Sequence, residues 1–395
     1  MHEPPDTALP VPPLPPADGR PPLPADETPA DPTPDPSRHS GTAGASAPFQ
    51  PAPDLTPRPF VFTGNGAEYF RIWIVNLLLS VVTLGIYSAW AKVRRLRYFY
   101  GHTSVDGQAF GYHASPIAIL KGRLIAYAVV IVLAVLSEVA PLAASVIYFP
   151  LVVVTPIILV RAFRFRAANS SYRGLRFAFD GLESEAYRVF LLLPLLVPFT
   201  LGLAYPLVMK RQREFYVSES RYGRAQFGLE LPTGTVYRIY LLAMVVVLVL
   251  AAVAAAVMFG SMTAAGQAPS AEAPPGAGFF AGFALLYVGF GATVVAVRTA
   301  FENLVWNHTR LDVHGFESRL RARTMLWLYA TNVLLIGGTL GLGVPWARVR
   351  MARYRAESLT LVPGGPLATE AMSGSESNAA TGAELSDAMD LDFGL

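Results

Sequence analysis

Four long apolar runs dominate the middle of the chain, and each has about the 20 residues that a helix needs to cross a bilayer. The runs are 117–139, 142–160, 236–259 and 279–297. Only Ala140 and Pro141 separate the first two, and a loop rich in Gly, Pro and Ala joins the second two. The pattern predicts four transmembrane helices that form two helical hairpins, 117–160 and 236–297.

Three further apolar runs are long enough to span but are interrupted by Gly or Pro: 72–91, 189–209 and 325–347. Lys and Arg cluster on both sides of the second and third, whereas the loops inside the two long hairpins contain neither. Because basic residues concentrate in cytoplasmic loops, we expect the broken runs to be re-entrant segments that return to the cytoplasmic side. The alternative is seven full crossings.

The broken runs belong to an internal repeat. When Phe60, Phe177 and Phe316 are taken as equivalent, a Thr-Leu-Gly triplet follows each at the same distance without a gap. Asn76 then coincides with Asn332. The related segments are 60–110, 177–227 and 316–362. Such self-similarity indicates repeated structural units.

A nine-residue motif ends in phenylalanine and occurs four times. Its copies are 102–110, 169–177, 219–227 and 308–316. Each carries a central Asp-Gly, Arg-Gly, Gly-Arg or similar pair, which is typical of a two-residue β-hairpin. Two strands without a local partner, 60–62 and 359–361, are predicted to pair with each other. The expected fold is therefore an all-α polytopic membrane protein with small cytoplasmic β-hairpins between its helices.

Composition supports a membrane domain between two tails. Of the 395 residues, 53% are hydrophobic and 15% are charged, compared with about 25% charged in soluble domains. The proline-rich segment 1–58 and the acidic segment 363–395 predict disordered tails on either side of a membrane domain at 59–362. The first tail is either a solvated tether or a docking segment for a protein partner.

Several function classes lose support from composition. The net charge is +3, but the basic residues sit at the ends of apolar runs, so we expect no nucleic-acid binding. The absence of cysteine excludes disulfides and thiolate chemistry. Four histidines are candidate metal ligands, namely His102, His113, His308 and His314. We expect no metal site, because a hydrogen-bonding role in the turn accounts for all copies of the motif. No catalytic constellation is evident, and we expect neither an enzyme nor a cofactor.

A stretch in the first repeat carries a family resemblance. Asn76, the residues 83–94 (TLGIYSAWAKVR) and the following Arg97-Tyr98 resemble the YjgN family of bacterial inner-membrane proteins. The resemblance covers roughly 58–362, and the middle repeat departs from it, with Leu207 where Trp90 stands in the first. It implies a multi-pass inner-membrane protein and assigns no activity. By the charge pattern both termini are predicted to be cytoplasmic.

The broken runs supply the candidate site. Gly and Pro at bilayer depth free backbone polar groups that only protein or a water-filled cavity can satisfy, and broken helices mark substrate sites in many transporters. The substrate-cavity candidates are Asn76, Thr83, Gly85, Thr200, Gly202, Asn332, Thr339 and Gly341. The alternative is that these residues serve helix–helix packing.

A second set of candidates could bind lipid headgroups. They are basic and aromatic residues at the cytoplasmic ends of the broken runs: Lys92, Arg94, Arg97, Trp90, Lys210, Arg211, Arg348, Arg350 and Trp346. Anionic lipids attract such clusters, and simple topological anchoring is the alternative.

The leading functional hypothesis is transport or channel-like activity at the broken helices. Charged residues are absent from the middle of the four long runs, which argues against an ion-coupled pump. The alternative is a non-catalytic scaffold that binds membrane lipids, or protein partners through its tails. The sequence leaves the substrate and the oligomeric state open.

Overall fold

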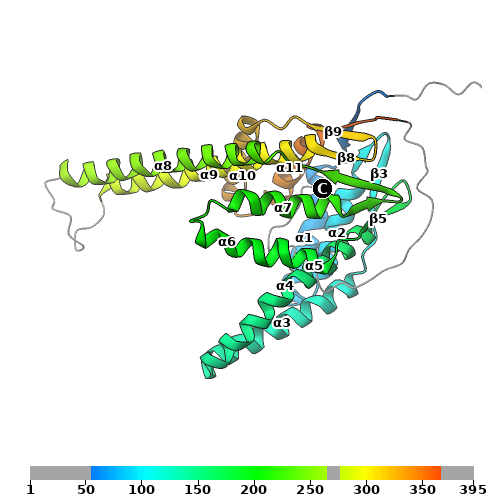
Figure 1. The fold of residues 1–395 in the computed structure, drawn as a ribbon, viewed down its shortest axis with the longest axis horizontal. Coiled ribbons are helices and arrows are strands. Elements are labelled where there is room, and N and C mark those ends of the chain that lie inside the picture. The colour runs from blue at the N-terminus through cyan, green and yellow to red at the C-terminus, as the bar shows by residue number, and fades with distance from the viewer. Residues whose placement is uncertain (1–54, 265–275, 366–395) are drawn as a thin grey trace, which may run out of the picture. The chain divides into compact units, whose positions relative to one another are not determined.

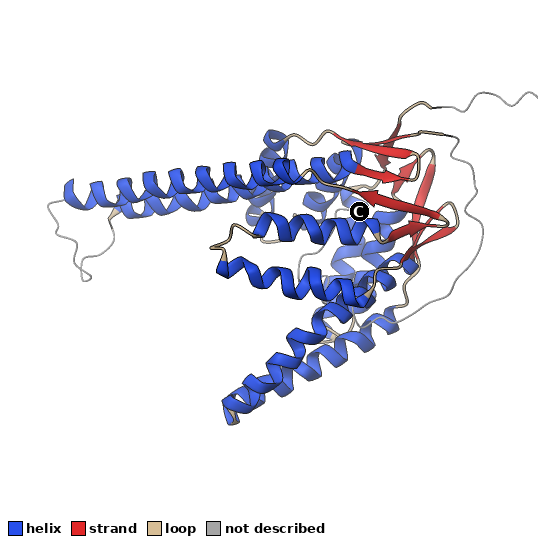
Figure 2. Cartoon of the chain, viewed as in Figure 1, coloured by secondary structure: helices blue, strands red, loops and turns tan. Residues whose placement is uncertain are grey.

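The structure is a computed structural model that describes residues 55–264 and 276–365, which lie in one compact unit. Its strands gather at one end and its helices extend away from them (Figures 1 and 2). The tails expected at 1–58 and 363–395 fall almost wholly outside the described residues.

The strands form a closed antiparallel barrel, and this corrects the expected fold class. The ten strands are β1 (Arg58–Phe62), β2 (Thr103–Val105), β3 (Gln108–Tyr112), β4 (Ser170–Tyr172), β5 (Leu175–Phe179), β6 (Ser220–Tyr222), β7 (Ala225–Leu229), β8 (Thr309–Leu311), β9 (His314–Ser318) and β10 (Leu359–Val362). Each predicted hairpin is present, but each also pairs with its neighbours until the sheet closes. The expectation of an all-α fold with separate small hairpins is therefore wrong.

Local turn chemistry explains the hairpins. Asp106 and Gly107 have φ values of 50° and 71°, and Arg173 and Gly174 have values of 48° and 80°. Positive φ at both central residues is the geometry of the two-residue turn that suits twisted strands. The two end strands pair with each other as predicted, but through Arg58 and Pro59, which lie opposite Leu361 and Thr360. Residues 60–62 pair with β2 instead.

Helical hairpins connect the strands. The helices are α1 (Gly66–Val82), α2 (Ser88–Gly101), α3 (Pro116–Val139), α4 (Pro141–Asn169), α5 (Glu183–Tyr187), the π-helix η1 (Arg188–Leu192), α6 (Leu193–Phe199), α7 (Tyr205–Ser218), α8 (Thr233–Ala264), α9 (Ala277–His308), α10 (Ala322–Gly338) and α11 (Val344–Glu357). Along the chain the order strand, outgoing helix, returning helix, strand occurs five times. The broken runs and the long hairpins are thus variants of one repeated unit.

Four helices are long and apolar enough to cross a membrane, and they match the four predicted spans. They are Pro116–Val139, Pro141–Asn169, Thr233–Ser261 and Ala277–His308. Their apolar side chains face outward, as Val249 and Phe283 illustrate, each 56% exposed. Outward apolar side chains on such helices suit a hydrocarbon solvent.

The three broken runs fold as shorter helical hairpins whose two ends both join the barrel. A hydrogen-bonded ladder cannot extend across the hydrocarbon core to strands on its other side. An arrangement of seven full crossings, which would place strands on both sides, is therefore incompatible with the closed barrel. How deeply the short hairpins enter a membrane stays a prediction.

The Thr-Leu-Gly triplet forms the tip of each short hairpin. In the first, the Thr83 hydroxyl donates to the Leu79 carbonyl at 2.7 Å and accepts from the Tyr87 amide at 2.9 Å. Gly85 follows with φ of 90°, a conformation that other residues rarely adopt. Thr200 and Thr339 make the same pair of bonds in the other two hairpins.

The helices pack in a closed ring around the barrel axis. Each returning helix contacts the outgoing helix of the next unit: α2 with α3, α4 with α5, α7 with α8, α9 with α10, and α11 with α1. The last of these contacts joins the two ends of the core. The returning helices α2, α4, α7, α9 and α11 are called the inner helices below, because they line the central cavity.

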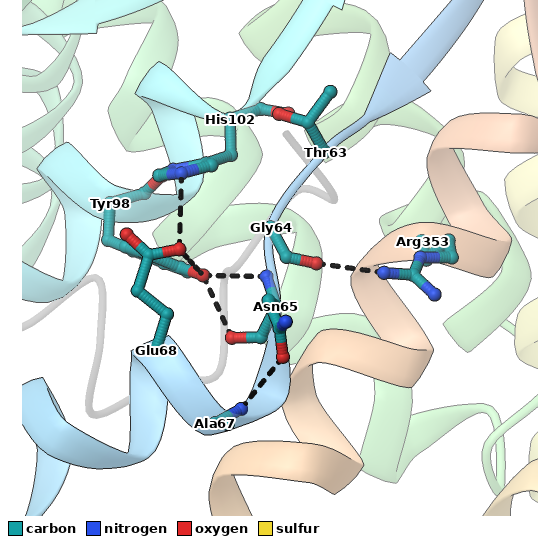
Figure 3. A network of polar contacts seen from close by, with 8 residues as sticks. All are labelled: Thr63, Gly64, Asn65, Ala67, Glu68, Tyr98, His102 and Arg353. Atoms are coloured by element: carbon teal, nitrogen blue, oxygen red, sulfur yellow. Dashed lines mark hydrogen bonds and ion pairs between the residues drawn. The ribbon is translucent and has the colours of Figure 1, made fainter.

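A polar latch recurs at every junction between units. One side chain of each inner helix bonds the backbone of the linker that leads into the next outgoing helix. The pairs are Arg97 with Ala114, Arg164 with Gly181, Glu214 with Leu231, Asn303 with Leu320, and Arg353 with Gly64. Figure 3 shows the latch of Arg353 on Gly64, beside the Tyr98 hydroxyl, which bonds both backbone groups of Asn65.

Candidate functional site

A large cavity lies where the inner helices meet the barrel. Its volume is about 1520 Å³, and residues from all five inner helices line it together with the barrel lumen. Ligand pockets for small molecules commonly measure about 300–1,000 Å³. The cavity is therefore large enough for a sizeable ligand or for several small ones.

The lumen of the barrel carries rows of equivalent side chains. Side chains of a strand alternate between its two faces, so one position of each unit points inward at the same level. The first row is Phe60, Phe110, Phe177, Phe227 and Phe316, and the second is Val105, Tyr172, Tyr222, Leu311 and Leu361. Neighbouring rings of these rows lie close together, with centroids 6.1 Å apart for Phe60 and Phe110 and 4.9 Å for Phe110 and Tyr172. The lumen thus holds an aromatic belt.

Positive charge dominates the walls of the cavity. Among the described residues, seven arginines and two acidic residues line it. They are Arg95, Arg166, Arg173, Arg213, Arg224, Arg348 and Arg355, with Glu302 and Asp312. Low-dielectric walls of one sign of charge concentrate ions of the opposite sign. The cavity consequently favours anions.

Four of these charged residues lie near one another on the helix side of the belt: Arg166, Arg213, Glu302 and Arg355. Arg355 donates to Glu302 at 3.2 Å, and the guanidinium of Arg213 lies 6.0 Å from the ring centroid of Phe301. Burial lowers the pKa of Arg213 to about 10; the nearby Glu302 carboxylate opposes this shift and the nearby Arg166 reinforces it. Arg213 therefore stays positively charged at neutral pH although it is desolvated.

A second group of polar side chains lies at the rim of the barrel that the β-turns form. Asp106 accepts hydrogen bonds from Arg58 and from Arg173, and so ties together three strand ends from two units. Just inside this rim, burial raises the pKa of the Tyr172 hydroxyl and of the Tyr222 hydroxyl. Both phenols are therefore neutral at physiological pH. Tyr172 donates to the Val105 carbonyl at 2.9 Å and Tyr222 to the Tyr172 carbonyl at 2.9 Å.

The candidates from the broken runs lie away from this cavity. The three threonines and the three glycines, namely Thr83, Gly85, Thr200, Gly202, Thr339 and Gly341, form the hairpin tips. Asn332 accepts from Arg350 at 3.2 Å and donates to the Ala347 carbonyl at 3.4 Å, so it joins α10 to α11. Asn76 is buried in α1, and its side-chain oxygen lacks a hydrogen-bond partner among the described residues.

The headgroup candidates are dispersed over the inner helices. Arg348 lines the cavity, Arg97 is a latch residue and Arg350 contacts Asn332. Lys92 is buried, and Lys210 bonds Thr233 at 2.6 Å. Arg211 points outward, with 59% of its side chain exposed. Arg94 lies over Tyr87, which also stacks on Trp90, and Trp346 packs on Phe70.

Histidine and acidic side chains do not assemble a metal site in the described parts of the chain. His102 and His308 each direct Nδ1 at the carbonyl oxygen one helical turn earlier, at 2.7 and 2.8 Å. Both residues thus occupy the same position at the end of an inner helix, as the spacing of the motif indicates.

Similarity to known proteins identifies the family of the chain. Residues 57–388 match the family described as "Bacterial protein of unknown function (DUF898)". The chain belongs to this family. The DUF898 assignment and the relatives named below confirm the resemblance found in the first repeat.

Curated relatives of this DUF898 chain are named "Inner membrane protein YjgN". The protein from Escherichia coli O157:H7 is 32% identical over 150 residues, and those from Salmonella typhimurium and E. coli K12 are each 33% identical. These alignments cover 35–38% of this chain and of each relative, well under two thirds of either. No solved structure matches. The relatives and the four apolar helices together identify an inner-membrane protein.

Reasoning from sequence missed the cavity because its residues lie far apart along the chain. Arg166 and Arg355 occupy equivalent positions, each four residues before the strand that ends its unit, but they lie on different helices, and Arg213 occupies a different position on a third helix. The repeated phenylalanine was the one available signal, since its five copies fall on strands that meet in one lumen.

Proposed function

We propose that the protein is a transport or channel-like membrane protein that passes an anionic solute through the arginine-lined cavity. The observation that carries this proposal is the excess of seven arginines over two acidic residues in one cavity inside a ring of helices. The proposed site is therefore the cavity at the barrel and not the broken helices. A transported solute meets positive charge at both ends of the aromatic belt, at Arg213 and Arg355 on the helix side and at Arg173 and Arg224 near the rim.

The barrel is proposed to face the cytoplasm, with both termini on that side. The basic residues that predict this orientation lie on the inner helices next to the barrel. Pairing of β1 with β10 supports a common side for the two ends of the core. A cysteine at Ser218, at the barrel end of α7, is expected to resist a membrane-impermeant thiol reagent in intact cells and to react after lysis. Labelling of intact cells would refute the orientation, and the chain contains no cysteine that could interfere.

Flux measurements test the transport proposal. The full chain is reconstituted into phosphatidylethanolamine–phosphatidylglycerol vesicles, and efflux of chloride, nitrate, inorganic phosphate and potassium is compared with that from empty vesicles. We expect efflux of at least one anion and none of potassium. Arg213→Gln should lower the efflux by about ten- to hundredfold, because a charge-assisted contact contributes about 1.5–3 kcal/mol.

Arg211→Gln is the matched control for this measurement. Arg211 lies two residues before Arg213 on α7, but its side chain is 59% exposed and does not line the cavity. Its loss should leave efflux unchanged. If none of the anions crosses the bilayer, the transport proposal fails and the scaffold hypothesis takes its place.

A further inference from the structure

We infer that the aromatic belt of the barrel is a binding site for the apolar body of an organic anion. This inference rests on the proposed function, which supplies the negative charge, and deepens it by naming the chemical class of the solute. The acidic group of such a solute would lie beside the basic residues of the cavity, outside the belt, and its apolar body would lie among the rings.

The rings of the belt form a continuous band along the wall of the lumen. The centroid of each ring lies between 4.9 and 6.4 Å from that of the next, within the range of favourable aromatic pairs. The band follows the barrel from β1 to β9 and ends on α9. Its members, in order, are Phe60, Phe110, Tyr172, Tyr222, Phe177, Phe227, Phe316 and Trp306. A ligand in the lumen therefore meets aromatic surface from several strands at once.

The lumen is wide enough to hold a ligand between these rings. A barrel of about eight strands has an interior that side chains fill or that holds one small ligand, and the diameter grows with the number of strands. Ten strands close this barrel, and its lumen belongs to the cavity of about 1520 Å³. Phe110, Phe177 and Phe227 are only half-buried although they line the lumen, so their rings keep open apolar surface. An apolar group that covers this surface gains the free energy of its removal from water.

The two rows of the belt recognise a ligand through apolar and ring contacts. Their side chains are those of Phe, Val, Leu and Tyr, and the hydroxyls of Tyr172 and Tyr222 already donate to the backbone carbonyls of Val105 and Tyr172 at 2.9 Å. A hydroxyl has a single proton to donate, so these rows hold no further donor for an anion. The faces of aromatic rings carry partial negative charge and disfavour an acidic group between them. The belt therefore selects the apolar part of a solute and keeps its charged group outside.

Basic side chains at both ends of the belt can receive that acidic group. On the helix side, Arg348 lines the cavity and donates to the Tyr69 hydroxyl at 3.3 Å. A guanidinium has several N–H donors, so this bond leaves others for a ligand. At the rim, Arg224 lines the cavity and is exposed. The apolar body can thus occupy the belt while the acidic group reaches a guanidinium on either side.

A binding experiment with the detergent-purified full chain tests this inference. Naphthoate, hexanoate and acetate share one carboxylate but differ in their apolar body, and each is titrated by calorimetry against a blank of detergent micelles. We expect naphthoate to bind about ten- to hundredfold more tightly than acetate, because burial of its rings adds apolar contact. Naphthalenemethanol, which lacks the charge, should bind more weakly than naphthoate. Hexanoate as tight as naphthoate would assign the site to any apolar body, and weaker hexanoate binding would assign it to an aromatic one.

Substitutions in the belt should change the preference for the apolar body in both directions. Phe227→Ala removes one ring and should weaken naphthoate binding by about two- to tenfold, while acetate binding stays the same. Leu311→Tyr adds a ring and should tighten naphthoate binding by a similar factor, a result that misfolding cannot produce. Leu311 occupies the position that Tyr172 and Tyr222 hold in other copies of the motif, so the repeated unit accommodates a ring at this position.

Phe199→Ala is the matched control for the loss of a phenylalanine. Phe199 lies at the end of α6, is 84% exposed and does not line the cavity, so its loss should change none of the affinities. The inference is overturned if naphthoate binds no more tightly than acetate, or if naphthalenemethanol binds as tightly as naphthoate. It is also overturned if Phe227→Ala has no larger effect than Phe199→Ala, or if Leu311→Tyr weakens naphthoate binding.

Failure of this inference and failure of the transport proposal give different results. Naphthoate binding without efflux of any anion would leave the belt site in place and refute transport. Efflux of chloride or nitrate that naphthoate does not inhibit would leave transport in place and refute the belt site.

Discussion

The three short and the two long helical hairpins join the same frame, which consists of the barrel strands and the latches, but they differ in length. At about 1.5 Å per residue, the 32 residues of α8 extend about 48 Å and the 17 residues of α10 about 26 Å. The hydrocarbon core of a bilayer measures about 30 Å. A long hairpin can therefore cross the membrane from the barrel side, whereas a short one is predicted to end within it.

The repeated unit performs two tasks, which are to build the cavity and to anchor the protein in the membrane. Barrel strands and a latch occur in both short and long units, and the latch arginines Arg164 on α4 and Arg353 on α11 each lie 2.9 Å from a linker carbonyl oxygen. The length of the hairpin varies without altering this frame. We infer that the frame builds the cavity and that the long hairpins add the membrane anchor.

The largest expected effect comes from placing a charge in a long hairpin. Val249→Arg on α8 puts a guanidinium among side chains that face outward from a membrane-spanning helix. Insertion should cost about 2.5–3.5 kcal/mol for a charge at the centre of a span. Leu340→Arg at a short tip should cost less, because the shorter hairpin lets arginine reach the interface. The yield of each variant in the membrane fraction measures these two costs. Equal losses of yield would contradict the difference in hairpin length.

An intermediate effect is expected from breaking the latches. Arg353→Gln and Arg164→Gln each remove a charged donor from a backbone carbonyl, which should lower the free energy of unfolding by about 1.5–3 kcal/mol. Denaturation in mixed detergent micelles measures the loss. If short and long units share one frame, the two variants should lose similar amounts.

Arg319→Gln controls for a general effect of losing an arginine. Arg319 pairs with Glu317 at 2.7 Å, but its side chain is 77% exposed, so its removal should cost about 0–1 kcal/mol. A loss in Arg164→Gln as small as in this control would show that the latch of the long unit is not needed.

The smallest effect concerns the tips of the short hairpins. Gly341 has φ of 93°, and a Cβ there would meet nothing within 4 Å. Gly341→Ala should therefore destabilise through backbone strain alone, by about 1–2 kcal/mol. Gly337→Ala, four residues earlier inside α10 and equally open, should instead stabilise by about 0.5–1 kcal/mol. Thermal unfolding distinguishes the two, and equal shifts would show that the tip is not held in this conformation.

Sequence reasoning recovered features that depend on nearby residues. Apolar runs of sufficient length predicted the four spans, because a spanning helix needs about 20 apolar residues in sequence. The repeated triplet located the hairpin tips, and pairs such as Asp106-Gly107 located the turns, because only a few residue types tolerate positive φ. The pairing of the two end strands, β1 and β10, followed from counting strands without partners, although Arg58 and Pro59 form it and not residues 60–62.

Reasoning from single residues did not lead to the arginine-lined cavity. Thr83 and Thr339 looked like cavity residues because a polar side chain in an apolar run suggests a solvated site. Their hydroxyls instead bond the backbone of their own turn, a local use that a sequence pattern does not distinguish from ligand binding. Arg213 could not be distinguished from the many other basic residues near the membrane, because positive charge there also determines the topology.

The sequence by itself determined the membrane location, the family, the repeated unit and the positions of its hairpins. Tertiary structure alone decided that the hairpins close into a barrel and that arginines from different helices meet beneath it. Pairing of β3 with β4 joins Tyr112 to Ser170 across an entire helical hairpin, and the Arg353 latch bridges the two ends of the core. Spans, turns and tips follow from short stretches of chain, whereas closure of a barrel depends on every unit having the same geometry.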